Sequence, residues 1–231
     1  MHDELLRQQI DYYRARAGEY DEWFLRQGRY DHGAEANDRW FAEVAQVTEA
    51  LDAFAPTGDV LELACGTGLW TQHLVRYGGR VTAVDAAPEV IAINRQRLGP
   101  DAPVEYIQAD LFSWRPSRQY DVVFFSFWLS HVPPERFDAF WDLVRSALKP
   151  RGRVFFVDSL YIESSTARDH TLEGDDATAV TRRLNGGETF RIVKVFYRPD
   201  ELEARLKAHG WEIAVESTPS YFLYGFGNPA H

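Results

Sequence analysis

The chain has 231 residues, 45% of them hydrophobic, and a formal net charge of −10, so it is long enough to bury the core of one α/β domain. An acidic surface repels phosphate backbones and anionic lipids, which disfavours nucleic-acid and membrane partners. No apolar run approaches the ~20 residues needed to span a bilayer.

Cysteine and histidine usage narrows the class of protein further. Cys65 is the one cysteine, which excludes an intramolecular disulfide and fits a reducing compartment. The N-terminus lacks the basic-then-apolar pattern of a signal peptide, and the cysteine and histidines lack metal-ligand spacing. We therefore expect a cytoplasmic protein without a metal site, and its oligomeric state stays open.

Residues 1–55 are expected to form a helical cap or lid. Apolar side chains recur at helical spacing in residues 3–17 and again in residues 34–54. Residues 12–24 combine many aromatic rings with charged groups. This mixture is awkward in a core and suits a lid that half-covers a ligand, although packing of the cap on the rest of the domain would use the same residues.

A glycine-rich turn is the main local signal, near the start of a predicted core over residues 58–160. Val60–Leu63 has the composition of a short buried strand, Gly66 and Gly68 follow at once, and a helix is expected over residues 69–77. Glycine lets the backbone approach a ligand closely, and a helix N-terminus offers unpaired N–H groups. The turn could therefore hold a nucleotide-like ligand, although a Gly-x-Gly is also compatible with a plain turn.

The rest of this core alternates strands with helices. Parallel neighbours need crossovers of this kind, so the pattern predicts a parallel, doubly wound sheet. Asp85 follows the second strand, where such folds place an acid on a ribose diol, and its alternative role is to cap the next helix. The expected strands are 80–84, 104–108, 121–126 and 153–157, and the expected helices are 88–98 and 134–148.

An insertion is expected over residues 161–198. Residues 160–180 are polar and acidic without a clean period, and we expect a mobile connection there. Two β-prone runs then flank Asn185-Gly186-Gly187, which is a hairpin signal. Arg191 and Lys194 are expected on an exposed face of this hairpin.

The final part of the predicted domain, residues 199–231, contains a helix and two strands. The helix is expected over residues 200–209. The strands, 211–216 and 221–226, are joined by a tight link, which makes them antiparallel.

Four signals lie in the core: Glu62-Leu63-Ala64-Cys65-Gly66-Thr67-Gly68, Asp85, Gln108-Ala109-Asp110-Leu111 and Leu148-Lys149-Pro150-Arg151-Gly152. In this order and spacing they resemble class I S-adenosylmethionine-dependent methyltransferases. The resemblance covers residues 58–160, and the chain ends resemble small-molecule members more loosely. It implies one domain over residues 1–231, with a Rossmann-like, doubly wound, mostly parallel seven-stranded sheet, an antiparallel last strand, an N-terminal helical cap and an inserted β-hairpin.

The resemblance implies S-adenosyl-L-methionine as the cofactor and S-adenosyl-L-homocysteine as its product, lying across the carboxyl ends of the first strands. Asp85 would accept hydrogen bonds from both ribose hydroxyls, and Asp110 would accept one from the adenine amino group. Glu62 would order the glycine turn or bind the methionine ammonium. The implied cofactor-binding residues are Tyr20, Glu62, Ala64, Gly66, Gly68, Asp85, Ala86, Asp110, Leu111 and Ser126.

Methyl transfer from this cofactor needs few catalytic groups. Methyl transfer is an in-line displacement at a carbon that the sulfonium charge already activates, so positioning and exclusion of water do most of the work. A base is needed only where the acceptor must lose a proton. His131, just beyond the fourth strand, is the best candidate for a catalytic base, with a structural loop role as the alternative.

We therefore expect methyl transfer to a small, partly apolar or aromatic metabolite at oxygen, nitrogen or carbon. Two alternatives remain open. One is a cyclase-like enzyme that binds S-adenosylmethionine without transferring its methyl group. The other is a nicotinamide-dependent oxidoreductase, which Thr71 disfavours because the dinucleotide fingerprint has a smaller residue at that position.

Overall fold

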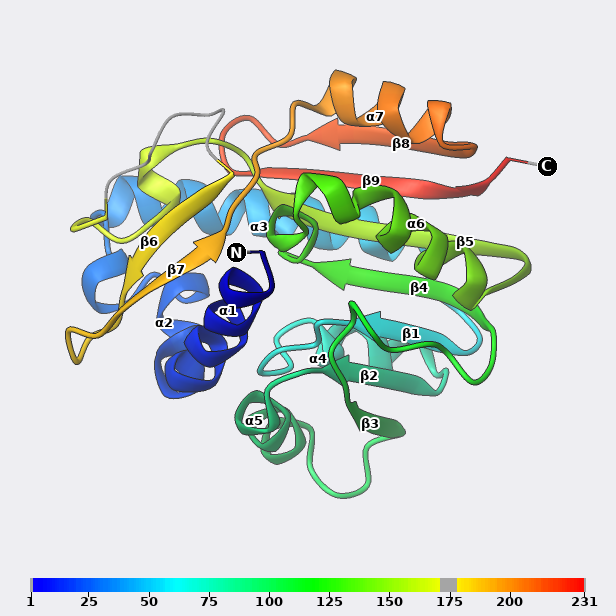
Figure 1. The fold of residues 1–231 in the computed structure, drawn as a ribbon, viewed down its shortest axis with the longest axis horizontal. Coiled ribbons are helices and arrows are strands. Elements are labelled where there is room, and N and C mark those ends of the chain that lie inside the picture. The colour runs from blue at the N-terminus through cyan, green and yellow to red at the C-terminus, as the bar shows by residue number, and fades with distance from the viewer. Residues whose placement is uncertain (1, 171–177, 231) are drawn as a thin grey trace.

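The computed structural model describes residues 2–170 and 178–230 and is built around a seven-stranded sheet in the order β3-β2-β1-β4-β5-β9-β8 (Figure 1). Neighbours among β1 to β5 are parallel, whereas β9 runs antiparallel to both β5 and β8. The predicted doubly wound sheet with an antiparallel last strand is confirmed. Its strands are β1 Val60–Leu63, β2 Val81–Asp85, β3 Val104–Gln108, β4 Tyr120–Ser126, β5 Leu148–Ser159, β8 Trp211–Ser217 and β9 Phe222–Pro229.

Helices cover both faces of the sheet, because its central strands are apolar on both sides. In Figure 1, α6 and α7 lie in front of the sheet and α3 lies behind it. Trp40 fills the core on the α3 side and Trp141 fills the core on the α6 side. One face carries α3 (Ala34–Phe54), α4 (Thr71–Leu74) and α5 (Pro88–Leu98), and the other carries α6 (Phe137–Ala147) and α7 (Pro199–Ala208).

Two further units meet at the edge of the sheet where β1 and β4 end. Helix α1 (His2–Arg16) packs against β7 (Thr189–Val193), which pairs with β6 (Ala179–Arg183) in a separate antiparallel hairpin. Figure 1 shows α1 beside this hairpin, with the short helix α2 (Tyr20–Phe24) next to them. The expected N-terminal cap helix and inserted hairpin are therefore present, and they close the carboxyl edge of the sheet.

Three local predictions need correction. The helix after the glycine turn is α-helical only over Thr71–Leu74 before a 3-10 turn, and β5 begins at Leu148 rather than at residue 153. Lys194 is only 7% exposed, although an exposed position was expected. Side chains alternate along a strand, so Lys194 falls on the same side as the buried Ile192 and not on the side of Arg191.

Part of the connection predicted to be mobile, residues 171–177, lies outside the described residues. The part described before it contains a 3-10 turn at Glu163–Ser165.

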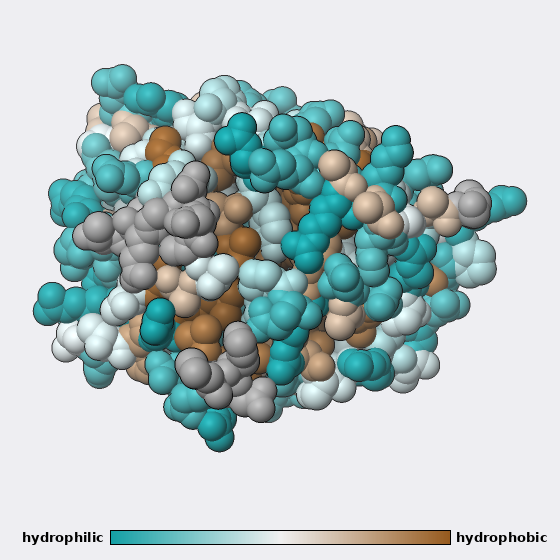
Figure 2. All heavy atoms as spheres, turned by 45° about the horizontal axis from the view of Figure 1, so that its top comes forward, coloured by the Kyte–Doolittle hydropathy of each residue, from teal (hydrophilic) through white to brown (hydrophobic). Residues whose placement is uncertain are grey.

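Hydrophilic side chains dominate the face of the molecule shown in Figure 2, and the apolar ones gather mainly in one central zone. Over residues 2–170 and 178–230, no helix combines the length and hydropathy of a membrane span.

Candidate active site

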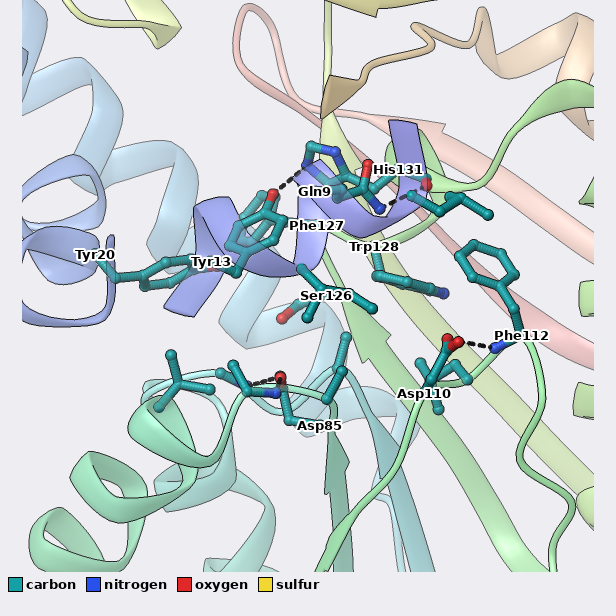
Figure 3. A pocket seen from close by; sticks show the side chains of 18 residues that line it. Gln9, Tyr13, Tyr20, Asp85, Asp110, Phe112, Ser126, Phe127, Trp128 and His131 are labelled. Carbon is teal, nitrogen blue, oxygen red and sulfur yellow. Dashed lines mark hydrogen bonds between the residues drawn. The ribbon is translucent and has the colours of Figure 1, made fainter. Parts of the chain in front are cut away.

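A cavity of about 700 Å³ opens at the carboxyl ends of β1, β2 and β4, under helix α1 (Figure 3). We call it the cofactor cavity. Helix α1 contributes Leu6, Gln9, Ile10 and Tyr13 to its lining. The residues predicted from sequence that line it are Tyr20, Ala64, Gly66, Asp85, Ala86, Asp110, Leu111, Ser126 and His131.

The glycine turn brings backbone to the cavity through left-handed conformations. Gly66 has φ +52° and Gly68 has φ +89°. A Cβ on Gly68 would lie 2.5 Å from Oδ1 of Asn94, so a side chain there has no room. Ala64 also has a positive φ of +53°, which is unusual for alanine and marks the end of β1 as a constrained position.

Asp85 lies at the end of β2 and anchors this turn. Its Oδ2 accepts a hydrogen bond of 3.0 Å from the Gly66 N–H, and its Oδ1 accepts one of 2.9 Å from the Ala87 N–H. Burial raises the pKa of Asp85, and these backbone N–H groups oppose that shift. Each carboxylate oxygen can accept a second hydrogen bond, so Asp85 can still receive a diol.

Asp110 lies across the cavity from Asp85 (Figure 3). Its Oδ1 accepts a hydrogen bond of 3.0 Å from the Phe112 N–H, which fixes the loop after β3. The Phe112 and Trp128 rings lie 5.5 Å apart between centroids and close this side of the cavity. Two carboxylates, one at the end of β2 and one in the loop after β3, therefore line the same cavity.

Two residues of the predicted set, Glu62 and Gly68, do not line the cofactor cavity. Glu62 is 1% exposed, and its Oε2 accepts a hydrogen bond of 2.7 Å from the Thr71 hydroxyl. Burial raises the pKa of Glu62 to about 8, and the Thr71 hydrogen bond lowers it. This hydrogen bond joins Glu62 on β1 to the first residue of α4, after the glycine turn. That Glu62 orders the turn stays a prediction. Direct ligand contact by either residue stays a prediction.

A second cavity of about 600 Å³ adjoins the cofactor cavity on the side of the hairpin. Four residues line both cavities, Tyr13, Tyr20, Phe127 and His131, and we call them the shared wall. In Figure 3, Tyr13, Phe127 and His131 lie above Ser126, and Tyr20 lies to their left. A ligand on one side of the shared wall therefore lies close to a ligand on the other.

Hydrogen bonds fix the tautomer of His131 in the shared wall. Its Nδ1 lies 2.7 Å from the Val193 carbonyl oxygen, which can only accept, so Nδ1 carries the proton. Its Nε2 then accepts the hydrogen bond from the Tyr13 hydroxyl, 2.8 Å away. Burial, together with the charge of Lys194, holds the pKa of His131 well below its usual range. The imidazole is therefore neutral, with both nitrogens engaged.

Three cationic residues of the second cavity, Arg16, Arg182 and Lys194, were missed from the sequence. Arg16 lies at the end of the helix predicted over residues 3–17, and Arg182 lies in a strand of the predicted hairpin. Neither was given a role in the site. The one signal in the sequence was that Lys194 lies two residues after Ile192, so the two side chains share a side of the strand. That side was expected to be buried. Over the described residues, no group of three or more His, Cys, Asp or Glu side chains is arranged to hold a metal ion.

Comparison with known proteins agrees with this geometry. Residues 60–152 match the family called "Methyltransferase domain". A solved structure called "DhpI-SAH complex structure" is 44% identical, with a TM-score of 0.79 over 98% of this chain and 97% of that chain. The chain belongs to the class I S-adenosylmethionine-dependent methyltransferases. Its cofactor is S-adenosyl-L-methionine, and S-adenosyl-L-homocysteine is the product form.

Two further members show how far the similarity extends. A "DhpI-SAM-HEP complex" is also 44% identical, with a TM-score of 0.80 over 97% of this chain and 98% of that one. The "Ubiquinone biosynthesis O-methyltransferase" of Xylella fastidiosa (strain 9a5c) is 37% identical over 166 residues, or 70% of this chain. This chain spans about 64% of the length of that relative.

Asp85→Ala should weaken binding of S-adenosylhomocysteine by about 1–3 kcal/mol, or roughly 5- to 150-fold, because a charged acceptor is lost. Isothermal titration calorimetry measures this, with Asp101→Ala, in an exposed turn, as the matched control. Unchanged affinity in Asp85→Ala would contradict the ribose assignment.

Glu62 generates a pH prediction. Its pKa is raised from 4.5 to about 8 in the folded protein, so its contribution to stability is complete below pH ~4.5 and is lost as the pH rises through ~8. Without ligand, the wild-type protein should therefore lose stability relative to Glu62→Gln between about pH 5 and pH 8. Urea unfolding at several pH values tests this, with the exposed Glu49→Gln as control. A difference in the free energy of unfolding between wild type and Glu62→Gln that does not change with pH would refute this prediction.

Proposed function

We propose that the protein transfers the methyl group of S-adenosylmethionine to a small molecule held in the second cavity. The observation that carries this proposal is the shared wall, because Tyr13, Tyr20, Phe127 and His131 line both cavities. With the ribose at Asp85 and the adenine at Asp110, the remaining end of the cofactor extends toward this wall. The methyl group would then face the second cavity.

The proposed reaction depends on positioning. A nucleophile in the second cavity attacks the methyl carbon in line with the departing sulfur, and cavity walls that exclude water hold the two partners at near-contact distance. Phe127 contributes a constrained position, since it has φ +51° and its N–H donates a 2.8 Å hydrogen bond to the Val157 carbonyl. Aromatic packing against Trp23, 4.7 Å away between ring centroids, fixes its ring.

His131 serves in this proposal as a positioning residue for Tyr13. Its Nε2 lone pair already accepts from the Tyr13 hydroxyl, and its environment opposes a positive charge. The Tyr13 oxygen keeps acceptor capacity toward the cavities. This role differs from the base predicted from the sequence, and a base role requires that the Tyr13 hydrogen bond be given up.

Of the two alternatives, membership of the methyltransferase family contradicts the nicotinamide-dependent oxidoreductase. The cyclase-like alternative predicts a product without an added methyl group. Incubation with S-adenosylmethionine and a panel of small acceptors, followed by mass spectrometry, separates the two. We expect S-adenosylhomocysteine and an acceptor heavier by one methylene in equal amounts. A converted acceptor of unchanged mass would overturn methyl transfer.

A double-mutant cycle tests the Tyr13–His131 pair. With an acceptor found in that panel, Tyr13→Phe and His131→Ala should each slow turnover at least about tenfold, because both misplace the same hydroxyl. The double variant should be no slower than the slower single variant, and affinity for S-adenosylhomocysteine should change little. A loss of about 10²-fold in His131→Ala, with Tyr13→Phe slowed less than threefold, would restore His131 as the base.

A further inference from the structure

Over the residues that the structure describes, the lining of the second cavity is positively charged. Arg16 from α1, Arg182 from β6 and Lys194 just after β7 all line it. The other polar side chains of the lining carry hydroxyl, imidazole or indole groups, and the described lining includes no Asp or Glu. Such a lining is unusual for two reasons. The chain has a formal net charge of −10, and buried charges are normally paired.

Arg16 is surrounded by tyrosine rings. It is 9% exposed, and its guanidinium carbon lies 5.5 Å, 5.0 Å and 5.7 Å from the ring centroids of Tyr12, Tyr20 and Tyr30. Its Nη2 donates a 3.3 Å hydrogen bond to the Tyr30 hydroxyl, whereas its buried Nε has no hydrogen-bond partner. Aromatic faces hold the cation in place, and they leave donor capacity unused.

Arg182 and Lys194 add to the positive charge that lines the second cavity. Nη1 of Arg182 is buried and has no hydrogen-bond partner, and burial lowers the pKa of this residue, with the charge of Arg16 lowering it further. Lys194 is 7% exposed and donates a 2.8 Å hydrogen bond to the Ser130 hydroxyl. Its Nζ lies 3.7 Å from Asp158, so one carboxylate offsets only part of the charge of the three cations.

We propose that the second cavity binds a small acid, with its anionic group held by Arg16, Arg182 and Lys194, and that an oxygen of this group accepts the methyl group. This inference rests on the proposed methyl transfer. The shared chemistry is a compact oxyanion, either a carboxylate or a phosphorus oxyacid, which the guanidinium donors can bind through two oxygens at once. The acceptor is then a polar acid and not the partly apolar or aromatic metabolite expected from the sequence.

The reaction balances without a base. A lone pair of the acid oxygen forms the bond to the methyl carbon while the carbon–sulfur bond breaks and its electron pair stays on sulfur. The sulfonium becomes a neutral thioether, and the acid loses one negative charge as it becomes a methyl ester. No proton has to leave, which agrees with a His131 whose two nitrogens are engaged and with a described lining free of carboxylates.

Binding can be tested with inorganic phosphate as the probe. In the presence of saturating S-adenosylhomocysteine, phosphate should raise the Tm of the wild-type protein above that in potassium chloride of equal ionic strength. Arg182→Gln and Arg16→Lys should reduce this rise by half or more. Arg183→Gln, which removes the same charge from the neighbouring strand residue outside both cavities, should retain it. No rise in the wild-type protein, or a rise that survives in both cavity variants, would overturn the inference.

Turnover with matched acceptors tests the second half of the proposal. Short alkylphosphonates and short carboxylic acids form two arms, with the corresponding neutral amides as controls, and phenols and amines form a third arm. We expect a methyl ester from an acid and none from its amide, with kcat/KM at least tenfold lower in Arg182→Gln and unchanged in Arg183→Gln. The arm that reacts identifies the oxyanion.

The outcomes separate the two proposals. Methylation of a phenol or amine, with no acid methylated, would overturn the acid inference and leave methyl transfer standing. If S-adenosylhomocysteine binds but no acceptor of any class gains a methyl group, both the inference and the proposed function fail.

Discussion

A buried glutamine joins the three segments that form the site. Gln9 on α1 is 2% exposed, and its amide nitrogen donates a 3.1 Å hydrogen bond to the His131 carbonyl after β4. Its amide oxygen accepts a 3.1 Å hydrogen bond from the Val193 N–H of β7. The Val193 carbonyl in turn accepts from His131 Nδ1. These bonds tie the cap, the sheet and the hairpin together at the shared wall, and a buried polar group that loses its partners is costly.

The two cavities follow from this arrangement. The cofactor cavity lies between the strand ends and α1, and the second cavity lies between α1 and the hairpin. Both therefore depend on the position of α1, whose successive turns contribute Gln9, Tyr13 and Arg16. Residues three or four apart lie on one helix face. One face of α1 therefore carries the buried glutamine Gln9, Tyr13 of the shared wall and the cation Arg16.

The charges of the site are also divided between the cavities. Asp85 and Asp110 are on the cofactor side, where hydroxyl and amino groups of the cofactor would be the donors. Arg16, Arg182 and Lys194 are on the other side, where an acid would be the acceptor. A cationic sulfonium and an anionic nucleophile would then approach each other across the shared wall, and their charges are lost together as the methyl group moves. The three cations would therefore bind and orient the acid, and the acceleration would come from holding the two reactants in line.

The cofactor side could be predicted from the sequence because its residues follow directly from strand ends. Parallel strands finish at one edge of a sheet, so the turn at Gly66, Asp85 and Asp110 had to converge. Glu62 was harder to place, because a strand residue can face the core as readily as the ligand. It faces the core beneath the turn.

The second cavity could not be predicted in the same way. Arg16, Arg182 and Lys194 come from α1 and from the hairpin, and sequence gives no register between a cap helix and an inserted strand pair. A charged residue on a strand is most often exposed, and Lys194 was therefore expected on the exposed face. Strand alternation, which puts Lys194 on the same side as Ile192, indicated the opposite. Only the tertiary packing of α1 against β7 brings these cations into one cavity.

A crystal structure with bound S-adenosylhomocysteine tests the central claim most directly, namely that the cofactor delivers its methyl group across the shared wall. The account predicts the ribose at Asp85, the adenine at Asp110 and the sulfur facing Tyr13 and Phe127, with the second cavity open to an acceptor. A sulfur atom directed away from the shared wall, or an adenosine bound in the second cavity, would contradict it.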